Sequence, residues 1–235
     1  MQSENPQIAP VQRLRITFTK QGTTRYISHL DLARAVERAL NRAGLPVAYT
    51  QGFNRRPRLS LAAALPLGYT SEAEVADVWL TDVVSPETFH ERLALCLPPG
   101  IGVRQVVEVP LTSPSIQQQM MASIYEVSFL DPVDEALLRS RVAEIMAADT
   151  LMRERVRAKS SKPQTIDLRP LIVSMELIED GSGSLYLKLR VVQTAAQTGR
   201  PDDVIAALGI DPLNTRVHRV ALVFSSDGNA PSSPD

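Results

Sequence analysis

The sequence is poor in the residues that hold most metal and redox centres. Its 235 residues include one cysteine, Cys96, and three histidines, His29, His90 and His218, which stand far apart. An iron–sulfur cluster normally needs three or four cysteine ligands. A zinc site uses ligands at short paired spacings, which these histidines lack. We therefore expect no cofactor and no metal site within this chain.

Other signals are also missing. A single cysteine excludes an intramolecular disulfide, which suits a reducing cytosol. The first residues do not combine a charged start with an apolar run, as a signal peptide does. No apolar run approaches the roughly 20 residues of a membrane helix. Phosphate-loop, dinucleotide and nucleophile-elbow motifs are absent as well. We expect a cytoplasmic protein without a membrane partner.

Charge is present but unevenly distributed. The formal net charge is −1, yet residues 12–60 hold ten basic and two acidic side chains, a net charge of +8. Residues 71–110 hold two basic and seven acidic side chains, and residues 153–170 hold six and two. Such asymmetry indicates a surface that meets an anionic partner.

The spacing of apolar residues predicts secondary structure in the first half. Leu14, Ile16 and Phe18 alternate with polar residues, which predicts a half-buried strand with Arg13 and Arg15 on its open face. A helix follows, with Ser28 as its cap. The other expected elements are extended segments at 47–50 and 58–62, a strand at 73–80, a helix starting at Ser85, and a strand at 103–109.

The second half repeats this order after a predicted linker at 111–122. The pattern predicts a strand at 125–130, a helix capped by Asp131-Pro132, a basic loop or ribbon within 153–170, a hairpin over 172–192, a helix at 200–208, a strand at 217–224 and a disordered tail at 225–235. We interpret the fold as α+β, with two tandem ferredoxin-like (β-α-β-β-α-β) units at 12–110 and 123–224, each with an antiparallel sheet.

Two segments are candidates for binding an anion. In the first, Arg25 and His29 flank a helix start, where backbone N–H groups attract negative charge. The alternative is a purely structural role, in which Ser28 and Asp31 cap the helix, Tyr26 packs and His29 bonds to the backbone.

The second candidate is the segment 51–58. Phe53 can stack on a nucleic-acid base, and Arg55, Arg56 and Arg58 can hold phosphates. The alternative is a solvated turn with Phe53 in the core. Three arginines so close together favour the interpretation that this segment binds an anion, which would neutralise their charge.

A basic ridge is predicted between these two segments. Arg34, Arg38 and Arg42 are spaced four apart, which places them along one exposed side of the helix. Only Glu37 offers a nearby acidic partner, although charged helix faces are also common on ordinary protein surfaces.

A series of short motifs runs in order along the chain. It comprises Tyr26-Ile27-Ser28-His29-Leu30-Asp31, Arg38-Ala39-Leu40, Gly44-Leu45-Pro46-Val47-Ala48-Tyr49, Gln51-Gly52-Phe53-Asn54, Leu65-Pro66-Leu67-Gly68, Ser71-Glu72, Asp167-Leu168-Arg169-Pro170 and Gly199-Arg200-Pro201. In these motifs the sequence resembles the radical-SAM-linked protein family, a bacterial family encoded beside, or fused to, a radical SAM protein. Arg55-Arg56 departs from the family, which more often has Pro-His there, so a catalytic histidine is not expected at that position.

The resemblance implies a radical SAM enzyme as partner, which would supply the cluster that this chain lacks. Our first hypothesis is a non-catalytic module that binds transfer or ribosomal RNA for that enzyme. Its RNA-binding residues would be Arg25, His29, Arg34, Arg38, Phe53, Arg55, Arg56 and Arg58.

Two alternatives remain open. One is a metal-independent endoribonuclease that uses His29 as general acid or base, assisted by Tyr26 and Arg25. The other is a protein–protein adaptor without RNA binding, whose basic face docks on an acidic patch of the partner enzyme.

Overall fold

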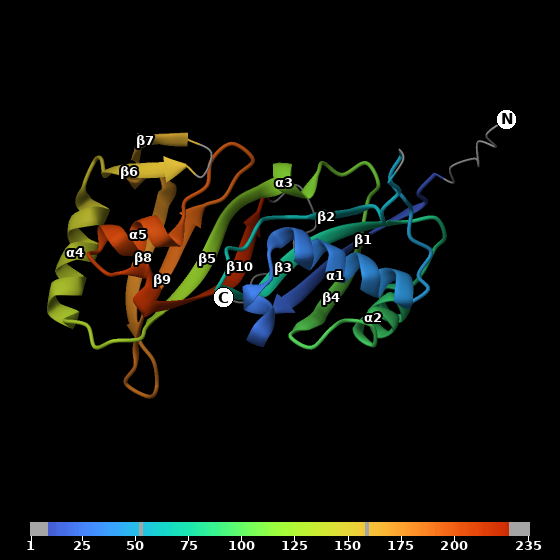
Figure 1. Cartoon of the computed structure of the whole chain (residues 1–235), viewed down its shortest axis with the longest axis horizontal. Helices are drawn as coiled ribbons and strands as arrows, with labels where there is room; N and C mark the ends of the chain where they lie inside the picture. The colour runs from blue at the N-terminus through green and yellow to red at the C-terminus, as the bar shows by residue number, and fades with distance from the viewer. Residues whose placement is uncertain (1–8, 52–53, 158–159, 226–235) are drawn as a thin grey trace. The chain divides into compact units, whose positions relative to one another are not determined.

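Each half of the chain folds around antiparallel strands accompanied by helices (Figure 1). The computed structural model describes residues 9–51, 54–157 and 160–225. The chain divides into two compact units, with the boundary between Gln119 and Met120. The fold is therefore α+β, and each unit is described by itself.

Four strands and two longer helices form the first unit. Its strands lie in the order β4-β1-β3-β2, and each neighbouring pair is antiparallel. The elements are β1 (Gln12–Lys20), η1 (Gly22–Tyr26), α1 (His29–Arg42), β2 (Leu59–Leu61), β3 (Thr70–Leu80), α2 (Pro86–Ala94), β4 (Ile101–Val109) and α3 (Ile116–Gln119). Where the sequence predicts an extended segment at 47–50, only isolated bridges form.

The core of this unit lies between the sheet and the helices α1 and α2. Leu14 and Ile16 of β1 belong to one buried cluster with Leu40 of α1 and Phe89 of α2. The predicted cap is present, because the Oγ atom of Ser28 accepts a hydrogen bond from the backbone of the third helical residue. The alternation of apolar residues in β1 thus predicts correctly which side of the strand is buried against the helices.

The prediction that Arg13 and Arg15 lie on an open face is wrong. Their exposed fractions are 2% and 1%, and both guanidinium groups bond to the carboxylate of Asp77, which is 0% exposed. Arg13 also donates to the carbonyl oxygens of Ser113 and Pro114. Because Asp77 stands beside Arg15 on the neighbouring strand β3, strand pairing gives both guanidinium groups one shared carboxylate inside the protein.

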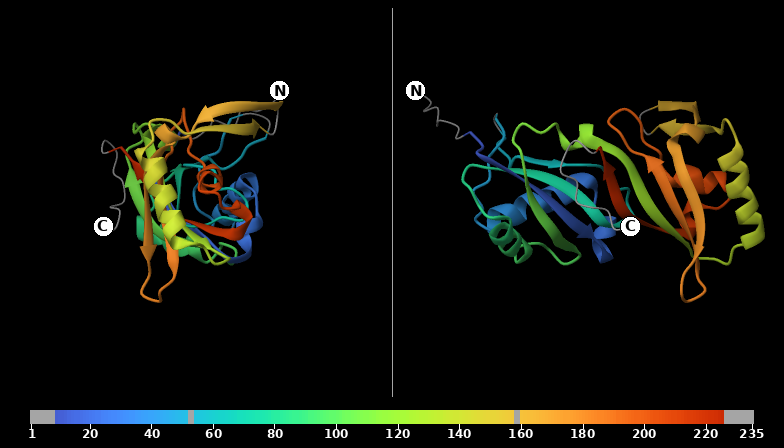
Figure 2. Two further views of the ribbon diagram at one scale, coloured as in Figure 1. Left: turned by 90° about the vertical axis from the view of Figure 1, so that its left-hand side faces the viewer. Right: turned by 180° about the vertical axis from the view of Figure 1, so that it is seen from behind.

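The second unit places its four sheet strands in the order β10-β5-β9-β8, again all antiparallel. A separate two-stranded ribbon, β6 with β7, is drawn in yellow and orange in Figure 2. The elements are β5 (Met120–Phe129), α4 (Glu135–Ala147), β6 (Met152–Arg157), β7 (Ser160–Asp167), η2 (Arg169–Leu171), β8 (Ile172–Glu179), β9 (Leu185–Val192), α5 (Pro201–Ala207), η3 (Pro212–Asn214) and β10 (Thr215–Phe224).

Some boundaries in this half differ from the sequence prediction. The helix α4 is capped by Asp134, which accepts from the backbone N–H of Leu137, and not by Asp131-Pro132. Where the sequence predicts the linker 111–122, the structure has α3 and the start of β5. The predicted tail lies outside the described residues, apart from Ser225. None of the described helices has the length and apolar composition needed to cross a membrane.

Candidate polyanion-binding surface

The connection between α1 and β2 is tied to the C-terminal end of α1. The hydroxyl of Tyr49 donates to Oδ1 of Asn41 over 2.7 Å. The connection also folds back on itself, since the backbone N–H of Thr50 donates to the carbonyl of Arg56 and that of Arg58 to the carbonyl of Ala48. Tyr49 therefore stands beside the last turn of α1. Phe53, the predicted base-stacking residue, lies outside the described residues.

Four arginines of α1 and this connection are exposed, and we call this set the arginine surface: Arg38, Arg55, Arg56 and Arg58. Arg38 precedes Asn41 by three residues, so both lie on the same side of α1. None of the four forms an ion pair with any residue that the structure describes. Their positive charges therefore face solvent without a neutralising carboxylate, which attracts anions.

Aromatic rings accompany these guanidinium groups. The guanidinium carbons of Arg58 and of the buried Arg13 lie 4.5 and 5.0 Å from the centroid of the Trp79 ring, in cation–π arrangements. Trp79 pairs with Arg13 and follows the core residue Val78, so Arg58 contacts the side of the sheet that faces away from α1. Tyr49, within the same connection, is 41% exposed. Guanidinium planes and aromatic rings are the groups on which nucleic-acid bases stack.

The other members of the predicted ridge have partners. Nη1 of Arg34 lies 3.2 Å from Oδ1 of Asp31, and both side chains are about half exposed. The Ser28 hydroxyl, followed by Arg34, holds the pKa of the Asp31 carboxyl below its usual value. Arg42 donates through Nη2 to the carbonyl of Cys96. Arg34 and Arg42 are therefore exposed but more constrained than Arg38.

The predicted residues Arg25 and His29 lie at the opposite end of α1. His29 is the half-buried first residue of the helix. Arg25 donates through Nε to the carbonyl of Gly22 and lies 5.7 Å from the ring of Tyr26. Twelve residues separate His29 from Asn41, which corresponds to about 18 Å along a helix. The structure thus distributes the predicted site residues along α1 instead of gathering them in one pocket.

A group of exposed apolar side chains was missed by the sequence reasoning. Tyr26, Leu30 and Leu67 are 68%, 65% and 63% exposed, so Tyr26 does not pack into the core as the structural alternative required. The backbone N–H of Gly68 donates to the carbonyl of Arg25, which brings two of the sequence motifs together. The motifs contained these residues, but periodicity gave no sign that they face solvent.

No group of three or more histidine, cysteine or acidic side chains with a metal-binding arrangement occurs within 9–51, 54–157 and 160–225. The first unit presents exposed guanidinium groups and the exposed ring of Tyr49. Groups of these kinds bind anions and stack on planar groups.

Comparisons with known proteins place the chain in a family. No curated protein matches it. A chain in a solved structure titled "Crystal Structure of a Cbf5-Nop10-Gar1 Complex" is similar over 91% of this chain, with 10% identity and a TM-score of 0.48, and the match spans 50% of that chain. A family model matches residues 13–201. The chain therefore belongs to the family described as "Uncharacterized protein conserved in bacteria (DUF2344)".

Proposed function

We propose that this protein binds RNA through the arginine surface and serves a radical SAM enzyme as an accessory protein. The observation that carries the RNA proposal is the set of exposed guanidinium groups of Arg38, Arg55, Arg56 and Arg58, which have no ion pair among the described residues. The enzyme partner follows from the sequence resemblance alone. Transfer RNA and ribosomal RNA are the substrates we consider.

The extent of the basic region favours a polymer over a small anion. Arg34 continues it along α1, and Arg25 lies just before the start of this helix, so the region extends over about 18 Å. A single phosphate or carboxylate group contacts only a small part of this basic region. A nucleic-acid strand repeats its charge every few ångströms and reaches both ends. The exposed ring of Tyr49 adds a surface on which an unpaired base stacks.

The proposal extends to the fold. We take both units, 12–110 and 123–224, as ferredoxin-like, with β6 and β7 as an insertion in the second. This is supported by the strand order, because each unit places its first long strand between its third and fourth. The fold carries no argument about the ligand, since one fold serves many functions.

A fluorescence anisotropy titration tests RNA binding. The full chain is titrated into labelled transfer RNA and into a ribosomal RNA fragment at about 0.1 M salt. We expect Arg55→Ala/Arg56→Ala to weaken binding roughly tenfold, because the variant makes fewer phosphate contacts and its binding therefore releases fewer counterions from the RNA. The matched control is Arg104→Ala/Arg139→Ala, which removes two exposed arginines that form ion pairs with Glu72 and Glu135.

Two outcomes contradict the proposal. One is the absence of any RNA affinity that falls as salt rises. The other is an equal loss in the two double variants, which would show that net charge alone, and not the arginine surface, determines binding. Crosslinking in cells followed by sequencing of the bound RNA then identifies the natural ligand.

A second candidate function, protein docking, is favoured by the exposed apolar group of Tyr26, Leu30 and Leu67. Exposed apolar groups of this kind often mark protein interaction sites. Co-purification of the radical SAM partner after nuclease treatment tests it. Tyr26→Ser/Leu30→Ser should lose the partner, whereas the control Leu95→Ser, at a residue that is 88% exposed elsewhere, should retain it. Retention by both variants contradicts docking at this site.

A further inference from the structure

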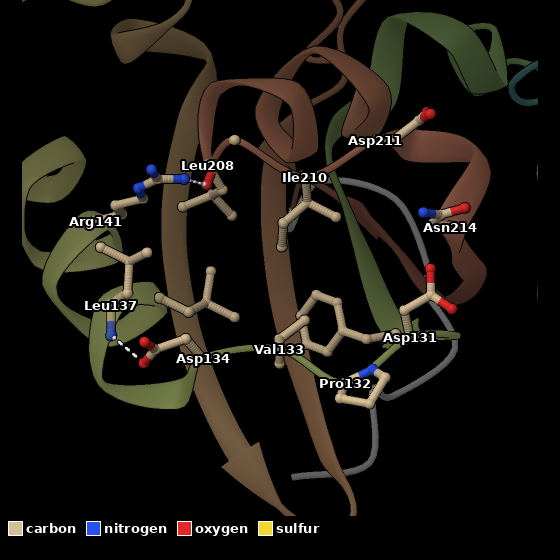
Figure 3. A pocket seen from close by; sticks show the side chains of 13 residues that line it. Asp131, Pro132, Val133, Asp134, Leu137, Arg141, Leu208, Ile210, Asp211 and Asn214 are labelled. Carbon is tan, nitrogen blue, oxygen red and sulfur yellow. Dashed lines mark hydrogen bonds between the residues drawn. The ribbon is translucent and has the colours of Figure 1, made fainter.

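The second unit contains a pocket with a volume of about 280 Å³ (Figure 3). It lies between the segment that enters α4 and the turn that leads from α5 to β10. Its volume is close to the lower end of small-molecule sites, roughly 300 Å³. None of the residues proposed for RNA binding lines it.

Apolar side chains form the interior of this pocket, and carboxylates surround them. Val133 and Ile210 occupy the middle of the view in Figure 3, and Leu137 lies at its left, near Arg141. Asp131, Asp134 and Asp211 lie around them. The remaining apolar residues of the lining include Phe129, Leu138 and Leu208.

Backbone hydrogen bonds fix this rim. Oδ1 of Asp134 accepts from the N–H of Leu137 over 3.0 Å, and Oδ1 of Asp211 accepts from the N–H of Leu213 over 2.9 Å. Arg141, which also lines the pocket, donates through Nη1 to the carbonyl of Leu208 over 2.6 Å. The pocket walls are therefore preorganised, which limits the entropic cost of ordering side chains when a ligand binds.

The charges of the lining do not cancel. The lining carries three carboxylates and one guanidinium, so its formal charge is negative. Among the described residues, these carboxylates do not form a group that could hold a metal ion. They are instead spread around an apolar interior, which matches a ligand whose charge and apolar body are separate parts of one molecule.

We propose that this pocket binds a small organic cation: an ammonium or guanidinium group carried on an apolar body. The apolar body displaces water from the side chains of Leu137 and Ile210, which is the favourable hydrophobic contribution. The cationic group lies at the rim, where it meets the carboxylate of Asp131, and the other two carboxylates add to the negative potential of the rim. This site is independent of RNA binding by the first unit.

Three probes of one length test the proposal: 4-phenylbutylamine, 4-phenylbutan-1-ol and 4-phenylbutyrate. They share an apolar body and differ in charge. Each is titrated into the full ¹⁵N-labelled chain, and binding is followed by amide chemical shifts in NMR spectra. We expect shifts at Gly209 and Ile210, with the amine binding on the order of tenfold more tightly than the carboxylate.

The variant Asp131→Asn/Asp134→Asn/Asp211→Asn separates charge from structure. Asparagine caps a helix about as well as aspartate, so the backbone bonds of Asp134 and Asp211 are retained. The triple variant should bind amine and alcohol equally. The control Glu135→Gln/Glu176→Gln/Glu179→Gln removes three exposed carboxylates that do not line the pocket and should keep the preference for the amine.

Several results overturn the proposal. They are equal affinity of the wild-type protein for all three probes, shifts confined to residues outside the pocket, or no binding at all. A preference for the amine that survives in the aspartate variant also overturns it. The single variant Asp131→Asn, whose side chain is not a helix cap, gives the same comparison if the triple variant does not fold.

Discussion

Two pairs of arginines in the first unit have opposite environments. Arg13 and Arg15 are buried against Asp77, whereas Arg55 and Arg56 are exposed and have no ion pair among the residues that the structure describes. Both pairs add the same formal charge to the basic segment 12–60. A count of charges along the sequence therefore overstates the electropositive surface, because part of that charge is neutralised inside the protein.

The buried pair is held by geometry as well as by charge. Arg15 donates through Nε to Oδ1 of Asp77 over 2.8 Å, and Arg13 donates to Oδ2 of the same carboxylate. Gln119 accepts from Arg15 over 3.2 Å. A buried guanidinium group needs such partners, since an uncompensated ion in the interior costs several kcal/mol.

The largest expected effect follows from removing the shared carboxylate. Asp77→Ala leaves two buried guanidinium groups without their anion, and we expect it to lower the free energy of unfolding by about 3–5 kcal/mol. Urea denaturation followed by circular dichroism measures this. The control Glu72→Ala breaks the exposed ion pair with Arg104 and should cost less than about 1 kcal/mol. Similar small losses in both variants would contradict a buried Arg13–Asp77–Arg15 cluster.

This cluster also shows where sequence reasoning ends. The alternation of Leu14, Ile16 and Phe18 identifies the buried side of β1 because that pattern is local. The burial of the Arg15 side chain depends on Asp77, which is 62 positions away and becomes its neighbour only through strand pairing. The Ser28 cap was predictable for the same reason as the strand, since donor and acceptor are three residues apart.

The candidate surface likewise has features that local spacing predicts and features that it does not. The ridge of Arg34 and Arg38 follows from helical spacing and is exposed as predicted. The contact between Tyr49 and Asn41, which brings Tyr49 beside α1, follows from no periodic pattern. The exposure of Leu30 and Leu67 could not be predicted either, because an apolar residue in a motif is more often buried.

Arg141 provides an intermediate case, an arginine held by a carbonyl oxygen instead of a carboxylate. Gly209, beside it, has φ +78°, and a Cβ atom there would overlap the guanidinium group of Arg141. We expect Gly209→Ala to destabilise the protein by about 1–2 kcal/mol, from backbone strain and displacement of Arg141.

The control for this variant is Gly183→Ala. Gly183 has a similar φ of +79°, but the nearest atom to its added Cβ is 3.6 Å away. Thermal unfolding of both variants separates backbone strain from the loss of the Arg141 contact. Equal losses would mean that Arg141 adjusts to the added methyl group without cost.

A smaller effect is expected at the exposed pair of Asp31 and Arg34. The Ser28 hydroxyl is the main cause of the lowered pKa of Asp31, and Arg34 contributes less. A lowered pKa in the folded state adds stability above the unfolded value of about 3.8, and this stability is lost as pH falls through the folded value. Ser28→Ala should raise the pKa of Asp31 toward 3.8 and cost about 1 kcal/mol through loss of the cap.

Carbon-detected NMR titration of the Asp31 carboxyl measures this change. Arg34→Ala is the comparison, because it removes the lesser cause and keeps the cap, so it should raise the pKa of Asp31 less than Ser28→Ala does. A larger rise in Arg34→Ala would reverse the assignment and make the ion pair, not the hydroxyl, the main stabiliser of the Asp31 carboxylate.

The smallest change in stability is expected at the exposed arginine pair, and it sharpens the contrast with Arg13 and Arg15. Arg55→Ala/Arg56→Ala should alter the free energy of unfolding by less than about 0.5 kcal/mol, since the two side chains are exposed and form no ion pair with a described residue. The same variant should reduce the magnitude of the negative slope of log K against log salt by about 1.4–1.8, which corresponds to two lost phosphate contacts. A large loss of stability with an unchanged slope would instead assign both arginines a structural role, like that of the buried pair.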